Sequence, residues 1–292
     1  MSTQPVLTLI DPQNGNLAFK IFSFGDNDHF DHLQRLNYYS IILIADGEGK
    51  LKADFSAHDF ARHDMFCFAP YQPFMLTSGS VSGVAINFHP DFFCIHRHQK
   101  EVACNGVLFN NIYQPPLLST SDKEFDGFMG LVEQMRTEMQ NVGLAQYELL
   151  VSLLKIFLIT ASRLKINQQP GSKENLPANK EPFILQNLKD AIEGHYKTKH
   201  TASDYSSLLH ISPKALAKIT RTHFNKTITN LISERIVIEA KRELYMTSKT
   251  VKEIAYGLGF DDEYYFSRFF KNNADVSPQL FRSTVGFARA EA

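Results

Sequence analysis

The sequence predicts an α+β chain, with a β-rich N-terminal half followed by two helices and an all-α C-terminal half. Two patterns support this class. Residues 6–88 contain short β-rich runs separated by turn residues, a spacing typical of a sandwich or small barrel. From residue 122 onward, apolar residues recur instead at helical spacing. A chain of 292 residues is long enough for each half to have its own core.

Turn signals such as Asp46-Gly-Glu-Gly49 separate the expected strands. Gly47 and Gly49 supply the positive φ that a hairpin needs, so they are not interpreted as a nucleotide-binding motif. Residues 89–120 are irregular, apart from a short helix expected at 91–98. The expected strands are residues 6–10, 17–22, 38–44, 50–55, 65–68 and 81–88.

Two amphipathic helices are expected next, at residues 122–139 and 144–165, with Gly143 between them. The second helix carries apolar residues over a surface too broad to be covered by one small sheet. Two interpretations follow from this pattern and both stay open. The helices form the contact surface of a homodimer, or they pack as a pair on the sheet of their own chain.

The polar stretch 167–180, which contains proline and glycine, is expected to link two domains, residues 1–166 and 181–292. Charge divides at nearly the same place. Residues 178–292 hold 17 Lys and Arg against 13 Asp and Glu, a net charge of +4, whereas residues 1–177 hold 13 against 18, a net charge of −5. A basic C-terminal part favours contacts with phosphate, and the acidic part is expected to face away from a nucleic acid.

The C-terminal part contains two copies of one layout: a short helix, a tight turn and a second helix with a polar outward face. The first copy covers residues 205–221 and the second covers residues 251–271. A helix expected at 227–246 joins them and is roughly 30 Å long. A rod of that length can place the two second helices about one DNA turn, roughly 34 Å, apart on one face of a duplex.

Local signals predict where these helices begin. Thr201 and Thr250 are expected to cap the first helix of each copy, and Ser212 to cap the second helix of the first copy. Either Asp261 or Asp262 is expected to cap the last helix. The outward residues of the two second helices are the candidate DNA contacts, namely Lys214, Ala217, Lys218, Arg221, Glu263, Tyr264, Ser267, Arg268 and Lys271.

The three cysteines do not make a disulfide framework, which favours reduced thiols and a cytosolic location. Cys67 lies in an apolar strand and is expected to be a core thiol rather than a nucleophile. No basic-then-apolar run of the signal-peptide kind opens the chain. The longest apolar stretch, residues 149–161, is too short to span a bilayer, so no membrane contact is expected.

A series of C-terminal residues keeps the order and spacing of a known domain: Ser212-Pro213, Leu216, Arg235, Ala240, Ile254-Ala255, Gly259-Phe260, Tyr265-Phe266, Phe270-Lys271, Ser277-Pro278 and Phe281-Arg282. In these residues the chain resembles the DNA-binding domain of the AraC/XylS family of bacterial transcription regulators. The resemblance implies a cytoplasmic, nucleoid-associated protein that binds double-stranded promoter DNA, with RNA polymerase as a further partner. The family usually has glycine where this chain has Asn225 and Asp275, the residue types that best tolerate left-handed backbone.

The hairpin at 46–49 and the strand 65–68 followed by Pro70-Tyr-Gln-Pro73 resemble the cupin-like effector domain that precedes this DNA-binding domain in many family members. The resemblance implies a cupin-like β-barrel. In a metal-binding cupin, histidines would stand where this chain has Gln34, Leu36 and Phe74. Leucine and phenylalanine cannot coordinate an ion, so neither a metal nor another cofactor is expected.

Aromatic residues are expected near the mouth of this barrel, at Tyr39, Phe66, Phe68 and Phe74. They either line a pocket for a small, largely apolar organic effector or simply fill the barrel, and both interpretations stay open. The sequence thus predicts a DNA-binding transcriptional regulator of the AraC type, modulated by an effector or by dimerisation, and not an enzyme. The alternative is a metal-dependent cupin enzyme with a helical accessory domain.

Overall fold

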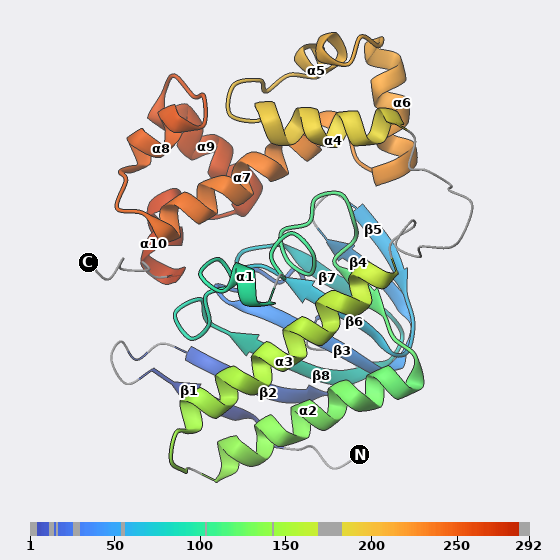
Figure 1. Cartoon of the computed structure of the whole chain (residues 1–292), viewed down its shortest axis with the longest axis vertical. Helices are drawn as coiled ribbons and strands as arrows, with labels where there is room; N and C mark the ends of the chain where they lie inside the picture. Colours follow the sequence, from blue (N-terminus) through green and yellow to red (C-terminus); the bar gives the residue numbers. More distant parts are fainter. Residues whose placement is uncertain are drawn as a thin grey trace. The chain divides into compact units, whose positions relative to one another are not determined.

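The structure, a computed structural model, describes residues 5–11, 15, 17–25, 30–53, 56–102, 104–141, 143–168 and 183–285. The chain forms two compact units, one made of Met1–Asn111 and Pro115–Ile166 and the other of Ile112–Gln114 and Asn167–Ala292. The first unit contains the sheets and the second is helical (Figure 1). Apart from Asn167 and Gln168, the linker expected at 167–180 lies outside the described residues.

Two antiparallel sheets form the framework of the first unit. The larger has the strand order β1-β2-β8-β3-β6-β9 and the smaller the order β5-β4-β7. The described strands therefore make two sheets and no closed barrel, so the structure confirms a β-rich first part and a helical second part but not the barrel. The strands are β1 (Leu7–Ile10), β2 (Leu17–Phe24), β3 (Tyr39–Gly47), β4 (Gly49–Ala53), β5 (Ser56–Phe60), β6 (Asp64–Phe68), β7 (Phe74–Thr77), β8 (Val81–Phe88) and β9 (Leu117–Ser119).

The larger sheet has a buried apolar cluster on each face. Successive side chains of a strand point to opposite faces. On β3, Ile41 and Leu43 belong to the cluster shared with the helices, whereas Ile42 and Ile44 belong to the cluster shared with the smaller sheet. Burial on both faces explains why β3 reads as a nearly continuous apolar run, and it fixes the register against β8, where Ile41 pairs with Ile86.

Helices α2 (Asp122–Gln140) and α3 (Gln146–Asn167) run across one face of the larger sheet (Figure 1). Ser121 caps α2 in a capping box with Glu124. The two helices meet at Phe128 and Phe157, whose ring centroids are 4.8 Å apart. Most apolar residues of α3 are buried in this layer, which supports packing on the chain's own sheet.

The short helix expected at 91–98 is wrong. The structure has turns there, and the nearby helix α1 spans Gln99–Val102. Four consecutive residues are buried here, Phe92, Phe93, Cys94 and Ile95, whereas a surface helix exposes part of every turn. The backbone N–H groups of Phe92 and Phe93 both donate to the carbonyl oxygen of His89, which closes a tight turn.

The second unit consists of helices around the central α7, against which α4, α6, α8, α9 and α10 pack. Its fully buried residues include Leu231 and Leu244 of α7 and Phe266 and Phe270 of α9. The helices of this unit are α4 (Phe183–His195), α5 (Ala202–Leu208), α6 (Pro213–Phe224), α7 (Ile228–Met246), α8 (Val251–Gly257), α9 (Glu263–Ala274) and α10 (Pro278–Val285). Helices α5 and α6 form the first predicted copy, α8 and α9 form the second, and α7 is the predicted joining helix.

Candidate nucleic-acid interface

The first helix of each helix-turn-helix copy begins with the same capping arrangement. Thr201 Oγ1 accepts a hydrogen bond from the Asp204 N–H (3.2 Å), and the Asp204 carboxylate accepts one from the Thr201 N–H (3.1 Å). Thr250 and Glu253 repeat these two bonds at α8, at 3.1 and 2.7 Å. The hydrogen bonds from the two threonines lower the pKa values of the Asp204 and Glu253 carboxyls. Both predicted caps are confirmed, and each satisfies backbone donors that a helix start leaves open.

The turns of the two copies pass through left-handed backbone at equivalent residues. His210 has a φ of 53° and Gly259 a φ of 80°. Only the second turn requires glycine, because a Cβ at Gly259 would overlap the carbonyl oxygen of Lys197 in the segment after α4. The tight turn predicted between the helices of the second copy is confirmed, and Gly259 is needed there for close approach as well as for positive φ.

The second helices, α6 and α9, begin at side-chain caps. Ser212 Oγ accepts a hydrogen bond from the Ala215 N–H (3.2 Å), and Pro213 occupies the first turn of α6. Asp262 Oδ1 accepts one from the Tyr265 N–H (2.6 Å), so Asp262 is the cap of α9. The caps fix where each helix begins, and the buried Leu216, Phe266 and Phe270 define the inward faces of the two helices.

Four predicted contact residues form one exposed face of α6. Lys214, Ala217, Lys218 and Arg221 are all exposed, and their spacing of three and four residues places them side by side. Leu216, on the opposite face, is buried. The structure thus brings together three cations around a small alanine surface, an arrangement suited to phosphate and base edges.

The predicted residues of α9 also share a face. Tyr264, Arg268 and Lys271 are exposed, with Tyr264 at 79%, and Glu263 and Ser267 are half-buried beside them. This face offers an aromatic ring, cationic donors and a carboxylate acceptor. These are the groups that distinguish bases in the major groove and hold the flanking phosphates.

The sequence interpretation missed two exposed aromatic residues in the same copy. Tyr265 on α9 is 58% exposed and Tyr256 on α8 is 52% exposed. The Lys252 ammonium lies 5.7 Å from the centroid of the Tyr256 ring. Because Phe266 is buried, helical spacing places the neighbouring Tyr265 at the side of α9. This spacing is the sequence signal that could have identified Tyr265 as exposed.

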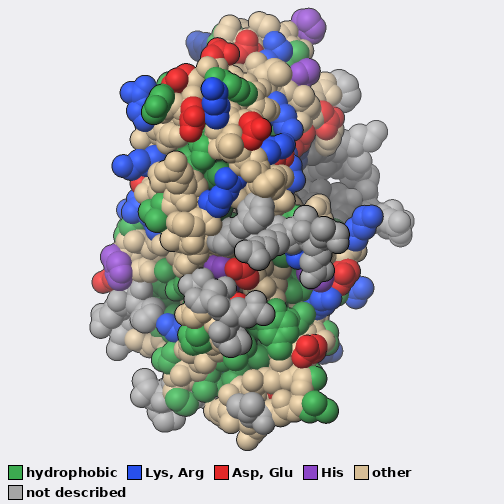
Figure 2. All heavy atoms as spheres, turned by 90° about the vertical axis from the view of Figure 1, so that its left-hand side faces the viewer, with side chains coloured by type: hydrophobic (Ala, Val, Ile, Leu, Met, Phe, Trp, Pro, Cys, Tyr) green, Lys and Arg blue, Asp and Glu red, His purple; other side chains and the backbone are tan. Residues whose placement is uncertain are grey.

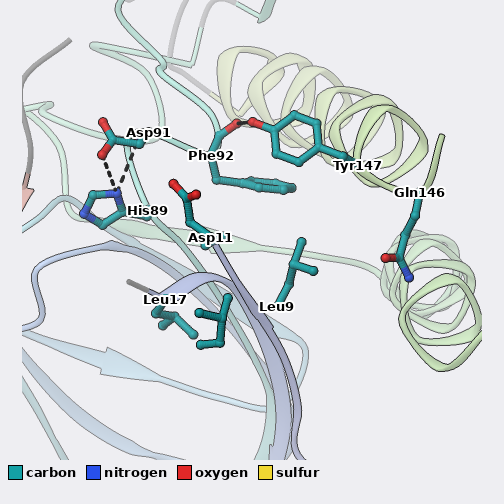
Figure 3. Close-up of a pocket in the computed structure, with 10 residues that line it drawn as sticks. Leu9, Asp11, Leu17, His89, Asp91, Phe92, Gln146 and Tyr147 are labelled. Atoms are coloured by element: carbon teal, nitrogen blue, oxygen red, sulfur yellow. Dashed lines mark hydrogen bonds and ion pairs between the residues drawn. The ribbon is translucent and has the colours of Figure 1, made fainter. Parts of the chain in front are cut away.

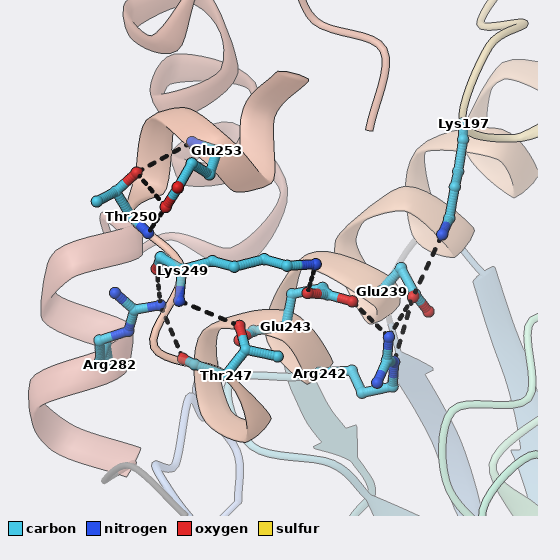
Figure 4. A network of polar contacts seen from close by, with 9 residues as sticks. All are labelled: Lys197, Glu239, Arg242, Glu243, Thr247, Lys249, Thr250, Glu253 and Arg282. Carbon is cyan, nitrogen blue, oxygen red and sulfur yellow. Dashed lines mark hydrogen bonds and ion pairs between the residues drawn. The ribbon is translucent and has the colours of Figure 1, made fainter. Parts of the chain in front are cut away.

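Helix α7 carries a network of charged residues that ties it to its neighbours (Figure 4). Glu239, with 8% of its side chain exposed, accepts hydrogen bonds from Arg242 (2.7 Å) and Arg235 (3.4 Å), and Lys197 lies 3.9 Å away. Burial by itself would raise the pKa of Glu239, but the hydrogen bond from Arg242 and the charges of the three cations lower it. Arg235 also pairs with Glu193 of α4 at 2.7 Å.

The end of α7 is joined to α10 through Arg282. Its Nε donates to the carbonyl oxygen of Leu244 (3.0 Å), and its Nη2 donates to that of Lys249 (2.6 Å), as Figure 4 shows in part. A guanidinium is a suitable cap for the open carbonyls at a helix end. The contact fixes the segment that leads into Thr250 and hence the start of α8.

The exposed faces of the two units differ in composition. In Figure 2, Lys and Arg side chains are prominent over the helical unit, and hydrophobic side chains are prominent over part of the sheet unit. Among the described residues, no helix combines the length and hydropathy that crossing a bilayer requires. Cys67 is buried, and burial raises the pKa of its thiol to about 12, as suits the predicted core residue.

The residues predicted to line an effector pocket fall into two groups. Phe66, Phe68 and Phe74 lie together between the sheets, and the Phe68 and Phe74 rings stack with centroids 3.9 Å apart. Tyr39 lies on the other face of the larger sheet, stacked on Phe88 at 5.1 Å. The register explains the separation: Ser40 pairs with Phe68, so the preceding Tyr39 must point to the opposite face.

The positions where a metal-binding cupin would have histidines are structurally close to one another. Gln34 forms an isolated antiparallel bridge with Phe74. Within the described part of the chain, which omits His29, no group of three or more His, Cys, Asp or Glu residues is arranged to hold a metal ion.

Comparison with known proteins identifies the helical unit. Residues 205–284 match the family described as "Helix-turn-helix domain". The chain is 26% identical over 140 residues to the raffinose operon transcriptional regulatory protein RafR of Pediococcus pentosaceus, covering 48% of this chain and 46% of RafR. It is 23% identical over 257 residues to the Msm operon regulatory protein of Streptococcus mutans, covering 85% and 84% of the two chains.

These matches define the class: the chain carries an AraC-type helix-turn-helix domain, and its relatives are AraC-family transcriptional regulators. The chain spans less than half the length of RafR and 16% of the activator Btr of Bacillus subtilis. Among solved structures, ToxT of Vibrio cholerae aligns over 93% of this chain and 99% of that chain, with 16% identity and a TM-score of 0.42. A TM-score this low supports no inference about the present protein.

Proposed function

We propose that this chain is a sequence-specific DNA-binding transcriptional regulator that acts on double-stranded promoter DNA at the bacterial nucleoid, in the cytoplasm. The observation that carries the proposal is the repeated geometry of the second unit, in which two capped helices expose polar faces on either side of α7. The family of the relatives supports this function over the alternative of a cupin enzyme. The proposed contacts are Lys214, Ala217, Lys218, Arg221, Glu263, Tyr264, Ser267, Arg268 and Lys271.

A mobility-shift titration of the full chain against promoter fragments tests this function. The double variant Lys218→Glu/Arg221→Glu reverses two exposed charges on α6 and is expected to lose specific binding at moderate salt. The matched control is Lys123→Glu, an exposed lysine on α2 of the other unit, which should bind like the unaltered chain. Equal binding by the α6 variant and the control would contradict the proposed interface.

For the first unit we propose a cupin-like fold that responds to a small organic effector. One buried atom supports an effector between the sheets: Ser40 Oγ has no hydrogen-bond partner among the described residues. Ser40 pairs with Phe68 and shares a strand face with Ile42, so its hydroxyl points toward the same aromatic cluster. We further propose the domain limits 1–166 and 181–292, joined by a linker at 167–180.

We also propose that the regulator is a homodimer through α3, and that RNA polymerase is a partner when it activates. Two residues support the dimer: Leu149 and Ile156 lie seven residues apart on one helix face and are 45% and 50% exposed. Analytical ultracentrifugation of Leu149→Asp/Ile156→Asp is expected to show a monomer, with Lys123→Glu on α2 as the control for an exposed charge change away from that face. A dimer that withstands the double change would place the interface elsewhere.

A further inference from the structure

A cavity of about 430 Å³ lies at one edge of the larger sheet (Figure 3). It is bounded by the end of β1, the start of β2, the segment after β8 and the first residues of α3. None of the four predicted effector-pocket residues lines it. Small-molecule sites typically have volumes of roughly 300–1,000 Å³, so this cavity can hold a compact organic ligand.

One side of the cavity is apolar and held in place. Leu9 and Leu17 lie across the cavity from the ring of Phe92 (Figure 3). The Phe92 ring meets the Tyr147 ring edge-on, with centroids 4.9 Å apart, and the Tyr147 hydroxyl donates a hydrogen bond to the Phe92 carbonyl oxygen (2.7 Å). These contacts fix both rings, so an apolar group can lie between Phe92 and the two leucines.

The other side carries two carboxylates around a buried histidine. His89 is 2% exposed, and its Nδ1 accepts a hydrogen bond from the Asp91 N–H (3.2 Å). The Asp91 carboxylate lies 3.4 Å from the same nitrogen. The carboxylates of Asp11 and Asp91 both lie on the His89 side of the cavity (Figure 3).

Negative charge dominates this space. None of the described residues that line the cavity is a lysine or an arginine. Burial raises the pKa of the Tyr147 hydroxyl, and the negative charges of Asp11, Glu148 and Asp91 raise it further. The same field disfavours an anionic ligand and favours a cationic one.

We propose that this cavity binds a small organic amine in its protonated form, with the ammonium group between Asp11 and Asp91 and an aromatic or aliphatic body against Phe92 and Leu9. Ammonium donates strong, charge-assisted hydrogen bonds to carboxylates. The apolar part of the ligand removes the surfaces of Phe92 and the two leucines from water, which also favours binding. The site does not depend on the proposed DNA binding, because every lining residue belongs to the sheet unit.

Isothermal titration of the full chain at neutral pH, without DNA, tests this proposal. The probe is 2-phenylethylamine, and the comparators are 2-phenylethanol, which lacks the charge, and 3-phenylpropanoate, which reverses it. We expect saturable binding of the amine, at least about tenfold tighter than either comparator. Asp11→Asn should weaken amine binding by about tenfold or more, whereas Asp126→Asn, an exposed aspartate on α2, should leave it unchanged.

Two outcomes would overturn the proposal. One is the absence of saturable binding up to about 10 mM amine, which is weaker than ordinary ligand recognition. The other is an affinity that is equal for the amine and the alcohol, or unaffected by Asp11→Asn. Thermal unfolding of each variant verifies that it is folded. If Asp11→Asn does not fold, Asp91→Asn removes the other carboxylate charge and tests the same site. Loss of DNA binding in other experiments leaves this test intact, since no DNA enters the titration.

Discussion

Asn225 and Asp275 occupy the same position in the two helix-turn-helix copies, and both hold left-handed backbone. Asn225 follows α6 with a φ of 54°, and Asp275 follows α9 with a φ of 60°. Each N–H donates to the carbonyl oxygen four residues earlier, which closes the helix end. The expectation of left-handed backbone at both positions is confirmed.

Asn225→Gly and Asp275→Gly are therefore expected to be neutral or to stabilise the helical unit by up to about 1 kcal/mol, since glycine removes the Cβ that is crowded there. The control is Ala217→Gly within α6, which should cost about 1 kcal/mol because its backbone is helical. Urea unfolding followed by circular dichroism measures all three. Destabilisation by both end substitutions, as large as that of the control, would contradict this account of the helix ends.

Gly259→Ala is expected to destabilise the helical unit by more than about 2 kcal/mol. Left-handed backbone alone costs an alanine about 1–2 kcal/mol, and the new Cβ would also overlap the Lys197 carbonyl oxygen. The matched control is His210→Ala, at the equivalent turn position, which already accommodates a side chain and should change stability by less than about 0.5 kcal/mol. Equal effects of the two changes would mean that the close approach to Lys197 is unimportant.

The sequence predicts the helical unit well because its signals are local. Capping residues such as Thr201 and Ser212, and a turn glycine at Gly259, act within a few residues of the structure they determine. The strands of the sheet unit are harder to predict from the sequence, and β5 (Ser56–Phe60) and β7 were not predicted. The Ser-Ala-His-Asp-Phe sequence of β5 has no β-branched residue, and the strand depends on pairing with β4.

The candidate sites also differ in how far the sequence predicts them. The exposed faces of α6 and α9 follow from helical periodicity once the caps are known. Seven of the nine candidate contacts are exposed and Glu263 and Ser267 are half-buried, and their contact with DNA stays a prediction. The separation of Tyr39 from Phe68 depends instead on the register between β3 and β6, which no local pattern fixes. The cavity beside Phe92 joins four segments that are distant in sequence, and only the fold reveals it.

Arg268→Ala and Lys271→Ala are expected to weaken DNA binding in different ways. If the Arg268 side chain reaches a base edge, Arg268→Ala should reduce the binding free energy by about 1–3 kcal/mol and relax base specificity at one position. Lys271 should weaken all sequences alike and reduce the salt slope by about one unit, as expected of a phosphate contact. Binding titrations over a panel of single-base variants and salt concentrations separate the two, and identical profiles would refute these roles.

Glu239→Gln is expected to destabilise the helical unit by about 1–3 kcal/mol at neutral pH, since it removes a buried carboxylate that accepts hydrogen bonds from two arginines, which keep Glu193 and Glu243 as partners. The pKa of Glu239 is lowered in the folded state, so its contribution is present above the unfolded value of about 4.3 and is lost as pH falls through the folded value. The variant should therefore lose less stability than the unaltered chain between about pH 5 and pH 3. Unfolding curves across this range, with Asp261→Asn as control, measure the difference, and parallel curves would contradict it.

Hydroxyl-radical footprinting of the full chain on its promoter fragment tests the central claim most directly. The two second helices lie at either side of α7, whose 19 residues span about 28 Å. We therefore expect each bound subunit to protect two segments about one helical turn, roughly 34 Å, apart on one face of the duplex. At low salt, where binding through α9 persists, charge reversal at Lys218 and Arg221 should remove one of the two segments and leave the other. A footprint with a single protected segment per subunit would contradict the account of two DNA-binding helices joined by α7.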